Sequence, residues 1–188
     1  MDLQRIAAKL YVTDFGTIGP GAAEYIPIFH RWIQSGELSG LPLDVADYGH
    51  VTDGPGVMLI GHESDRALDL SDGRPGFTYV RKRGASGALR ERFAQVIAET
   101  VGGARRLEAE PALEGAVRFR PDELGITVFD RLNAPNTRST LEALCDHISA
   151  AVADVLPGAK TSLVQVGDER RPFRVDVAIT GVAQPTAA

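Results

Sequence analysis

Apolar residues recur along this chain with two spacings, one typical of strands and one typical of helices. Short apolar or alternating runs bounded by glycine, proline, serine and aspartate predict strands. These runs lie at residues 6–12, 43–51, 57–63, 67–70, 77–81, 117–120, 125–131, 162–166 and 173–179. Three further segments have apolar residues at helical spacing. We therefore expect an α+β protein with three helices packed on an antiparallel-rich sheet.

The helices are expected where start and stop signals flank the helical spacing. They begin at Pro27, Ser86 and the capping box Ser139-x-x-Glu142, and they end near Gly36, Thr100 and Pro157. The order strand, helix, hairpin appears at both ends of the chain. This order suggests a single domain, 1–188, with a βαββ pseudo-repeat at 4–65 and 117–180. A hairpin and a helix, 66–116, would be inserted between the two. The alternative is that βαββ units are common and the halves are unrelated; whether the 67–81 hairpin joins the main sheet stays open.

Composition limits the setting in which the protein works. The net charge of −5 argues against binding to nucleic acid or to a membrane surface. No apolar run approaches the roughly 18 residues of a membrane span. Cys145 is the single cysteine, so no internal disulfide can form. Together with an N-terminus that lacks a signal-peptide pattern, these features predict a cytoplasmic protein.

Four segments resemble a family of uncharacterised bacterial proteins of similar length. They are FHRWIQ (29–34), DVADYGHV (44–51), GPGVMLIGHESD (54–65) and RLNAPNT (131–137). The resemblance covers most of the chain and implies a bacterial, cytoplasmic protein. It brings no known activity, cofactor or catalytic residue.

Histidines and carboxylates gather around the hairpin of residues 43–65. If TDGPG forms its turn, Val51 pairs with Val57, and Tyr48, His50 and His62 share one face. The two histidines then lie about 13 Å apart along the ladder, so they cannot bind one metal ion.

A right-handed crossover between the first two strands would bring the ends of those strands together. Asp14, His30, His50 and Asp53 would then converge, and could bind a divalent metal or act as acid and base near neutral pH. The alternative is that the aspartates are ordinary turn residues and that His30 is a residue on the helix surface.

A weaker candidate joins His62 with Asp44 and Tyr48, as a general base with an orienting group. The same three side chains could equally form a hydrogen-bonded structural cluster.

An anion site is suggested where a basic strand end leads into a helix start. Its residues would be Arg81, Arg83, Ser86, Gly87 and Arg90. Backbone N–H groups and arginines at a helix N-terminus hold phosphate or carboxylate well. The alternative is a solvated strand end with an ordinary serine cap.

Both faces of the 43–65 hairpin are partly apolar, with Val45 and Leu59 on one face and Tyr48 and Ile60 on the other. Helices cover only one face, so the other should meet a pocket, the second half of the chain or another copy. We therefore expect a cytoplasmic binding or accessory protein that takes a small anionic ligand, a protein partner or a second copy of itself. The alternative is a small enzyme that uses Asp14, His30, His50 and Asp53. The sequence identifies no cofactor and no particular metal.

Overall fold

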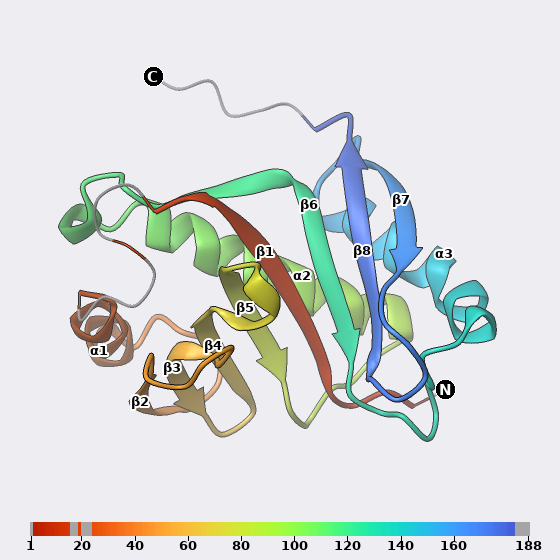
Figure 1. The fold of residues 1–188 in the computed structure, drawn as a ribbon, viewed down its shortest axis with the longest axis horizontal. Coiled ribbons are helices and arrows are strands. Elements are labelled where there is room, and N and C mark those ends of the chain that lie inside the picture. The colour runs from red at the N-terminus through yellow and green to blue at the C-terminus, as the bar shows by residue number, and fades with distance from the viewer. Residues whose placement is uncertain (1, 16–18, 20–23, 183–188) are drawn as a thin grey trace.

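Strand β1 (Ile6–Asp14) lies inside an eight-stranded sheet in which all neighbouring strands are antiparallel (Figure 1). The computed structural model describes residues 2–15, 19 and 24–182. The strands follow in the order β2 (Pro42–Tyr48), β3 (Gly56–Gly61), β4 (Ser64–Asp69), β5 (Gly76–Arg81), β1, β6 (Arg118–Val128), β8 (Phe173–Thr180) and β7 (Lys160–Gln165).

In the described part of the chain, three α-helices pack on one face of this sheet. They are α1 (Tyr25–Ser35), α2 (Leu89–Glu108) and α3 (Arg138–Val155). Two short 3-10 helices, η1 (Ser71–Gly73) and η2 (Pro111–Leu113), lie in connections. The predicted class, α+β with helices packed on an antiparallel sheet, is confirmed.

The chain follows a similar path at its two ends. From β1 it crosses through α1 to the edge strand β2 and returns by β3, β4 and β5 to pair with β1. From β6 it crosses through α3 to the other edge strand, β7, and returns by β8 to pair with β6. The hairpin of β4 and β5 is therefore part of the main sheet. The pseudo-repeat itself stays a prediction.

The turn between β2 and β3 differs from the expected one. Tyr48 pairs with Gly56 and Ala46 with Met58, so residues 49–55 form a loop and not a tight turn. Val51 N–H donates to the Tyr48 carbonyl at 2.9 Å, and Gly54 N–H donates to the Val51 carbonyl at 3.1 Å. These local turns use residues that the apolar pattern assigned to a strand. The expected pairing of Val51 with Val57 was wrong.

Two other boundaries were also predicted wrongly. Residues 117–120 and 125–131 were expected to be separate strands, but β6 runs through the intervening RPDE with register shifts against β1. Helix α2 begins at Leu89, and its first turn is capped by Glu91, whose Oε2 accepts the Ala88 N–H at 2.8 Å. Ser86 therefore does not cap it. The acidic side chain three positions into the helix provided the stronger signal.

The core lies between the helices and the sheet face that they cover. Alternate residues of β1, namely Ile6, Ala8 and Leu10, belong to one continuous cluster of buried apolar side chains. Helix α2 approaches this face closely, because Thr100 Oγ1 lies 3.3 Å from the Ala8 carbonyl oxygen. Gly103 permits the approach, since a Cβ there would lie 2.3 Å from the Phe77 ring. Among the described residues, no helix has the length and apolar character needed to cross a bilayer.

Two adjacent glycines of α2 provide a matched test of this packing. An alanine Cβ at Gly102 would meet nothing within 4 Å, so Gly102→Ala should stabilise the protein by about 0.5–1 kcal/mol through helix propensity. Gly103→Ala should destabilise it by about 1–3 kcal/mol, because the new methyl overlaps Phe77. Urea unfolding of both variants measures the difference. Equal free energies of unfolding would contradict the close contact.

Candidate functional site

The face of the sheet away from the helices carries a cavity of about 530 Å³. Small residues in the middle of this face, Ala7, Ala67 and Gly125, leave the space open. Side chains alternate between the two faces of a strand, so Lys9 and Tyr11 of β1 also point to this side. Residues from β1, β4, β5, β6 and the loop between β7 and β8 line the cavity. It therefore lies between the two halves of the chain.

The side chains of Lys9 and Tyr11 extend in opposite directions, each over a glycine of a strand that flanks β1. A Cβ at Gly76 of β5 would lie 2.9 Å from the Lys9 Cγ atom, and a Cβ at Gly125 of β6 would lie 2.5 Å from the Tyr11 hydroxyl. The missing side chains provide the space in which these two residues lie. Their divergence leaves the floor of the cavity between them.

On one side, the Lys9 ammonium forms an ion pair with Asp69. Lys9 Nζ lies 2.9 Å from Asp69 Oδ2 and 3.2 Å from the Ser71 carbonyl oxygen. Ser71 holds the same carboxylate through its backbone N–H at 3.0 Å and its hydroxyl at 2.9 Å. The Thr78 hydroxyl lies 3.4 Å away from it. Asp69 is thus fixed from several directions.

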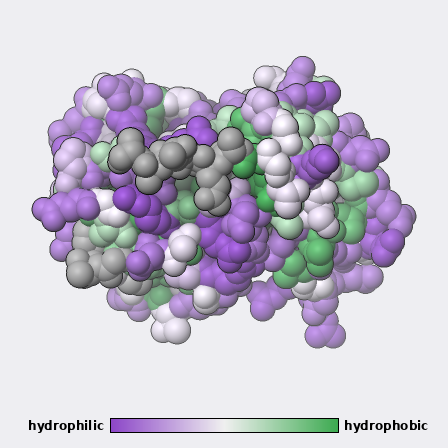
Figure 2. Space-filling view, turned by 90° about the horizontal axis from the view of Figure 1, so that it is seen from above, coloured by the Kyte–Doolittle hydropathy of each residue, from purple (hydrophilic) through white to green (hydrophobic). Residues whose placement is uncertain are grey.

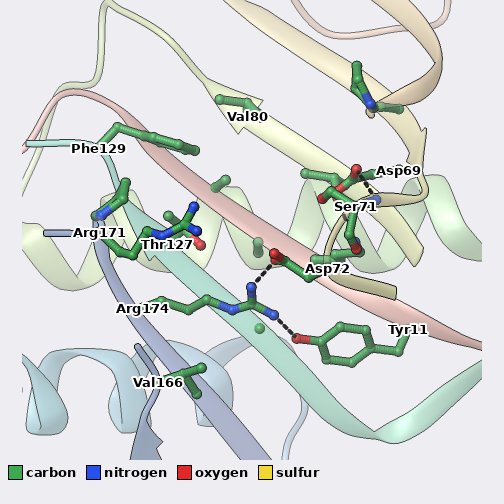
Figure 3. A pocket seen from close by; sticks show the side chains of 18 of the residues that line it. Tyr11, Asp69, Ser71, Asp72, Val80, Thr127, Phe129, Val166, Arg171 and Arg174 are labelled. Atoms are coloured by element: carbon green, nitrogen blue, oxygen red, sulfur yellow. Dashed lines mark hydrogen bonds and ion pairs between the residues drawn. The ribbon is translucent and has the colours of Figure 1, made fainter. Parts of the chain in front are cut away.

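On the other side, the Tyr11 hydroxyl contacts Arg174, which in turn contacts Asp72 (Figure 3). This hydroxyl donates to Asp176 Oδ1 at 3.0 Å and accepts from an Arg174 nitrogen at 3.2 Å. Arg174 also pairs with Asp72 of η1, which joins the two halves across the cavity. Arg74 stacks on the Tyr11 ring, 3.8 Å from its centroid, and pairs with Asp176 at 2.9 Å.

Burial changes the proton affinity of both β1 side chains. Burial lowers the pKa of Lys9, and the nearby Asp69 carboxylate only partly opposes this shift. Burial raises the pKa of Tyr11, against the opposing hydrogen bond from Arg174. The cavity floor therefore carries an amine that loses its proton more readily than usual beside a phenol that keeps its proton.

Arg171, in the loop before β8, provides a cation without an anionic partner. Its guanidinium points across the sheet toward Thr127 in Figure 3. No hydrogen bond or ion pair involves its side chain within the described residues. Lys9 and Arg174, the other cations that line the cavity, are paired with Asp69 and Asp72.

The structure does not bring Asp14, His30, His50 and Asp53 together. Three strands separate β2 from β1, about 19 Å at the usual strand spacing. Asp14 pairs across to Arg118 of β6 on the opposite side. His30 is exposed on α1, and His50 is exposed in the loop between β2 and β3. Only Asp53 lines the cavity, where its carboxylate accepts the Asp72 N–H.

The expected geometry was wrong because the parallel β1 and β2 are not neighbours. Within the described residues, no group of three or more histidine, cysteine or acidic side chains is placed to hold a metal ion.

The weaker histidine cluster is also divided by the observed register. His62 follows β3, and its N–H donates to the Leu41 carbonyl at 2.8 Å. Tyr48 pairs with Gly56 at the other end of the same hairpin. Only Asp44 lies at the end where His62 is found, and its carboxylate accepts its neighbour's N–H. The expectation that Tyr48 and His62 lie together was wrong.

Arg81 and Arg90 of the expected anion site have partners of their own, whereas no side-chain partner of Arg83 occurs among the described residues. Arg81 donates to the Arg83 and Gly84 carbonyl oxygens at 2.8 and 2.9 Å, and Arg90 pairs with Asp154. Gly87 has a φ of +84°, and a Cβ there would lie 2.2 Å from the Glu91 carboxylate. That carboxylate occupies the position at the helix start where an anion would bind. Glu91, and not Ser86, caps the helix. These residues therefore form a strand-to-helix connection whose helix start is already capped.

Sequence reasoning missed the polar residues that line the cavity, namely Lys9, Tyr11, Asp69, Asp72, Arg171 and Arg174. One signal was present in β1, where Lys9 and Tyr11 alternate with buried apolar residues. No protein-family model matches the chain, and no curated protein matches it.

A double-mutant cycle tests whether Tyr11 depends on Gly125. Gly125→Ala should destabilise the protein by about 1–3 kcal/mol, because the new methyl would overlap the Tyr11 hydroxyl. In a Tyr11→Ala background, the same change should cost little, since the space is then free. Urea unfolding of the four proteins should give a coupling of about 1 kcal/mol or more. Additive effects would show that the two residues do not share this space.

Proposed function

We propose that the protein binds a small organic anion with an apolar body in the cavity on the open sheet face. The observation that carries this proposal is the unpaired guanidinium of Arg171, which lies beside a cavity whose exposed surface is mostly apolar. An arginine without a carboxylate partner beside such a cavity favours a ligand carboxylate or phosphate, which it can bind with two parallel hydrogen bonds.

Arg174 provides a second, fixed donor group beside the cavity. Asp72 and the Tyr11 hydroxyl hold its guanidinium in place before any ligand arrives. A donor that is already ordered loses little entropy when it binds, and this improves affinity. The two arginines lie on the side of the cavity formed by β8 and the loop before it, so we expect the anionic group there.

The remaining walls suit an apolar body of moderate size. Ala7, Met58, Val80, Phe129 and Val166 contribute carbon surface. Thr78 and Thr127 add hydroxyl groups that could orient a polar substituent. A cavity of about 530 Å³ falls within the roughly 300–1,000 Å³ range of small-molecule sites. This supports a ligand such as a branched aliphatic or aromatic carboxylate.

The proposal includes the source and location of the protein. A bacterial, cytoplasmic protein is supported by the resemblance of four segments and by a chain with one cysteine.

The proposal also includes a homo-oligomer or a protein partner, which is supported by apolar residues at both edges of the sheet. Leu43 of β2 is 58% exposed and Val164 of β7 is 62% exposed. Figure 2 shows a largely hydrophilic upper surface with hydrophobic residues gathered mainly on the side of β7 and β8.

Two neighbouring arginines allow a controlled binding test. We expect saturation-transfer NMR to detect binding of branched aliphatic and aromatic monocarboxylates of four to nine carbons. Arg171→Ala should weaken the best binder about tenfold or more, as expected for a lost charge-assisted contact. Arg170→Ala removes the same charge from an exposed position outside the cavity and should leave binding unchanged.

Two results would overturn the proposal. One is that no carboxylate of the set binds. The other is that Arg170→Ala and Arg171→Ala weaken binding equally, because the loss would then reflect only the general charge of the loop.

A further inference from the structure

We propose that Lys9 captures the carbonyl group of the bound anion as an imine, so that the ligand class is an oxo acid. This inference rests on the proposed binding function, and it adds a covalent step at a residue that anion binding alone does not require. A lysine in a desolvated pocket is the usual origin of such chemistry, because only the neutral amine is a nucleophile.

Lys9 is built into the cavity floor and does not extend into solvent. Only 8% of the residue is exposed, although lysine is seldom buried. Its carbon stem lies over Gly76, where an added Cβ would come within 2.9 Å of Cγ and 3.0 Å of Cε. Gly76 of the neighbouring strand β5 therefore leaves the space in which the Lys9 stem lies within the cavity floor.

One N–H of the Lys9 ammonium is free to donate a hydrogen bond to a ligand. It has three N–H donors, and two are used by Asp69 and the Ser71 carbonyl oxygen. No acceptor for the third occurs among the described residues. A ligand carbonyl oxygen in the cavity could accept this third hydrogen bond, which would bring its carbon close to Nζ.

Groups for the proton transfers are already in contact with Lys9. Asp69 lies 2.9 Å from Nζ, and Ser71 holds its carboxylate in position. Burial lowers the pKa of Lys9, although the Asp69 and Asp72 carboxylates oppose this shift. Release of the ammonium proton to Asp69 or to water therefore requires less free energy than at a surface lysine.

The reaction balances without an oxidant or a reductant. The ammonium gives one proton to Asp69, and the Nζ lone pair then forms a bond to the carbonyl carbon. The carbonyl π electrons move to the oxygen, and a proton passes from the nitrogen to this oxygen to give a carbinolamine. Asp69 returns its proton to the hydroxyl, which leaves as water while the nitrogen lone pair forms the protonated imine. The net change is the loss of one water molecule, and the Asp69 carboxylate is regenerated. Arg171 and Arg174 would hold the ligand carboxylate during these steps.

The chain contains its own controls, because its lysines are Lys9, Lys82 and Lys160. The probe is 4-methyl-2-oxopentanoate with sodium cyanoborohydride, which reduces an imine to a stable secondary amine. Peptide mass spectrometry should find the reduced product at Lys9 at least about tenfold faster than at the other two lysines. Lys9→Arg, which keeps the charge beside Asp69, should abolish the fast product. Lys82→Arg should leave it unchanged.

Titration with 2-hydroxy-4-methylpentanoate separates the two proposals, since this ligand has the charge and shape of the probe but no carbonyl. Arg171-dependent binding of the hydroxy acid, with no selective product at Lys9, would overturn imine formation and leave anion binding intact. Equal labelling of the three lysines would also overturn imine formation. A selective Lys9 product without binding of the hydroxy acid would support amine capture and count against the anion site. Absence of both would overturn both.

Discussion

The rest of the structure depends on one constraint, the alternation of apolar and polar side chains along strand β1. Ile6, Ala8 and Leu10 face the helices and join the core, whereas Lys9 and Tyr11 face the cavity. A shift of one residue in the register of β1 would exchange the two sets. Lysine and tyrosine would then enter the apolar core. The packing of α2 and the form of the cavity therefore follow from one alternation.

Electrostatics explains why the open face contains pairs and not isolated charges. Removing an ion from water is costly unless a partner offsets the loss. Lys9 has Asp69, and Arg174 has Asp72. Breaking either pair would leave a poorly hydrated charge, so these contacts fix the positions of their side chains more than they add stability. Arg171 differs because it is exposed and can remain hydrated until a ligand replaces water.

The sequence predicted the helices and strands better than it predicted which strands lie side by side in the sheet. Local signals, such as helical spacing and the glycine that ends α1, act over a few residues and were sufficient for the class of fold. The position of β2 depends on the meander of β3, β4 and β5, which inserts three strands beside β1. No local pattern contains that information. The cluster around Asp14 and His50 was wrong for this reason, and Arg171 was missed because its cavity is formed by distant strands.

The contacts of the cavity show why dense polar segments of the sequence did not predict which polar side chains meet. Lys9 meets Asp69 across 60 residues of chain, and Tyr11 meets Asp176 across 165. Each partner is a single polar residue in an otherwise ordinary strand or turn. The dense segment at 43–65 instead forms an edge hairpin whose polar side chains are largely exposed. In a sheet with one covered face, an isolated polar residue within a buried central strand therefore indicates long-range polar contacts more directly than a cluster at the edge. It lacks access to bulk water and must find its partners inside the protein.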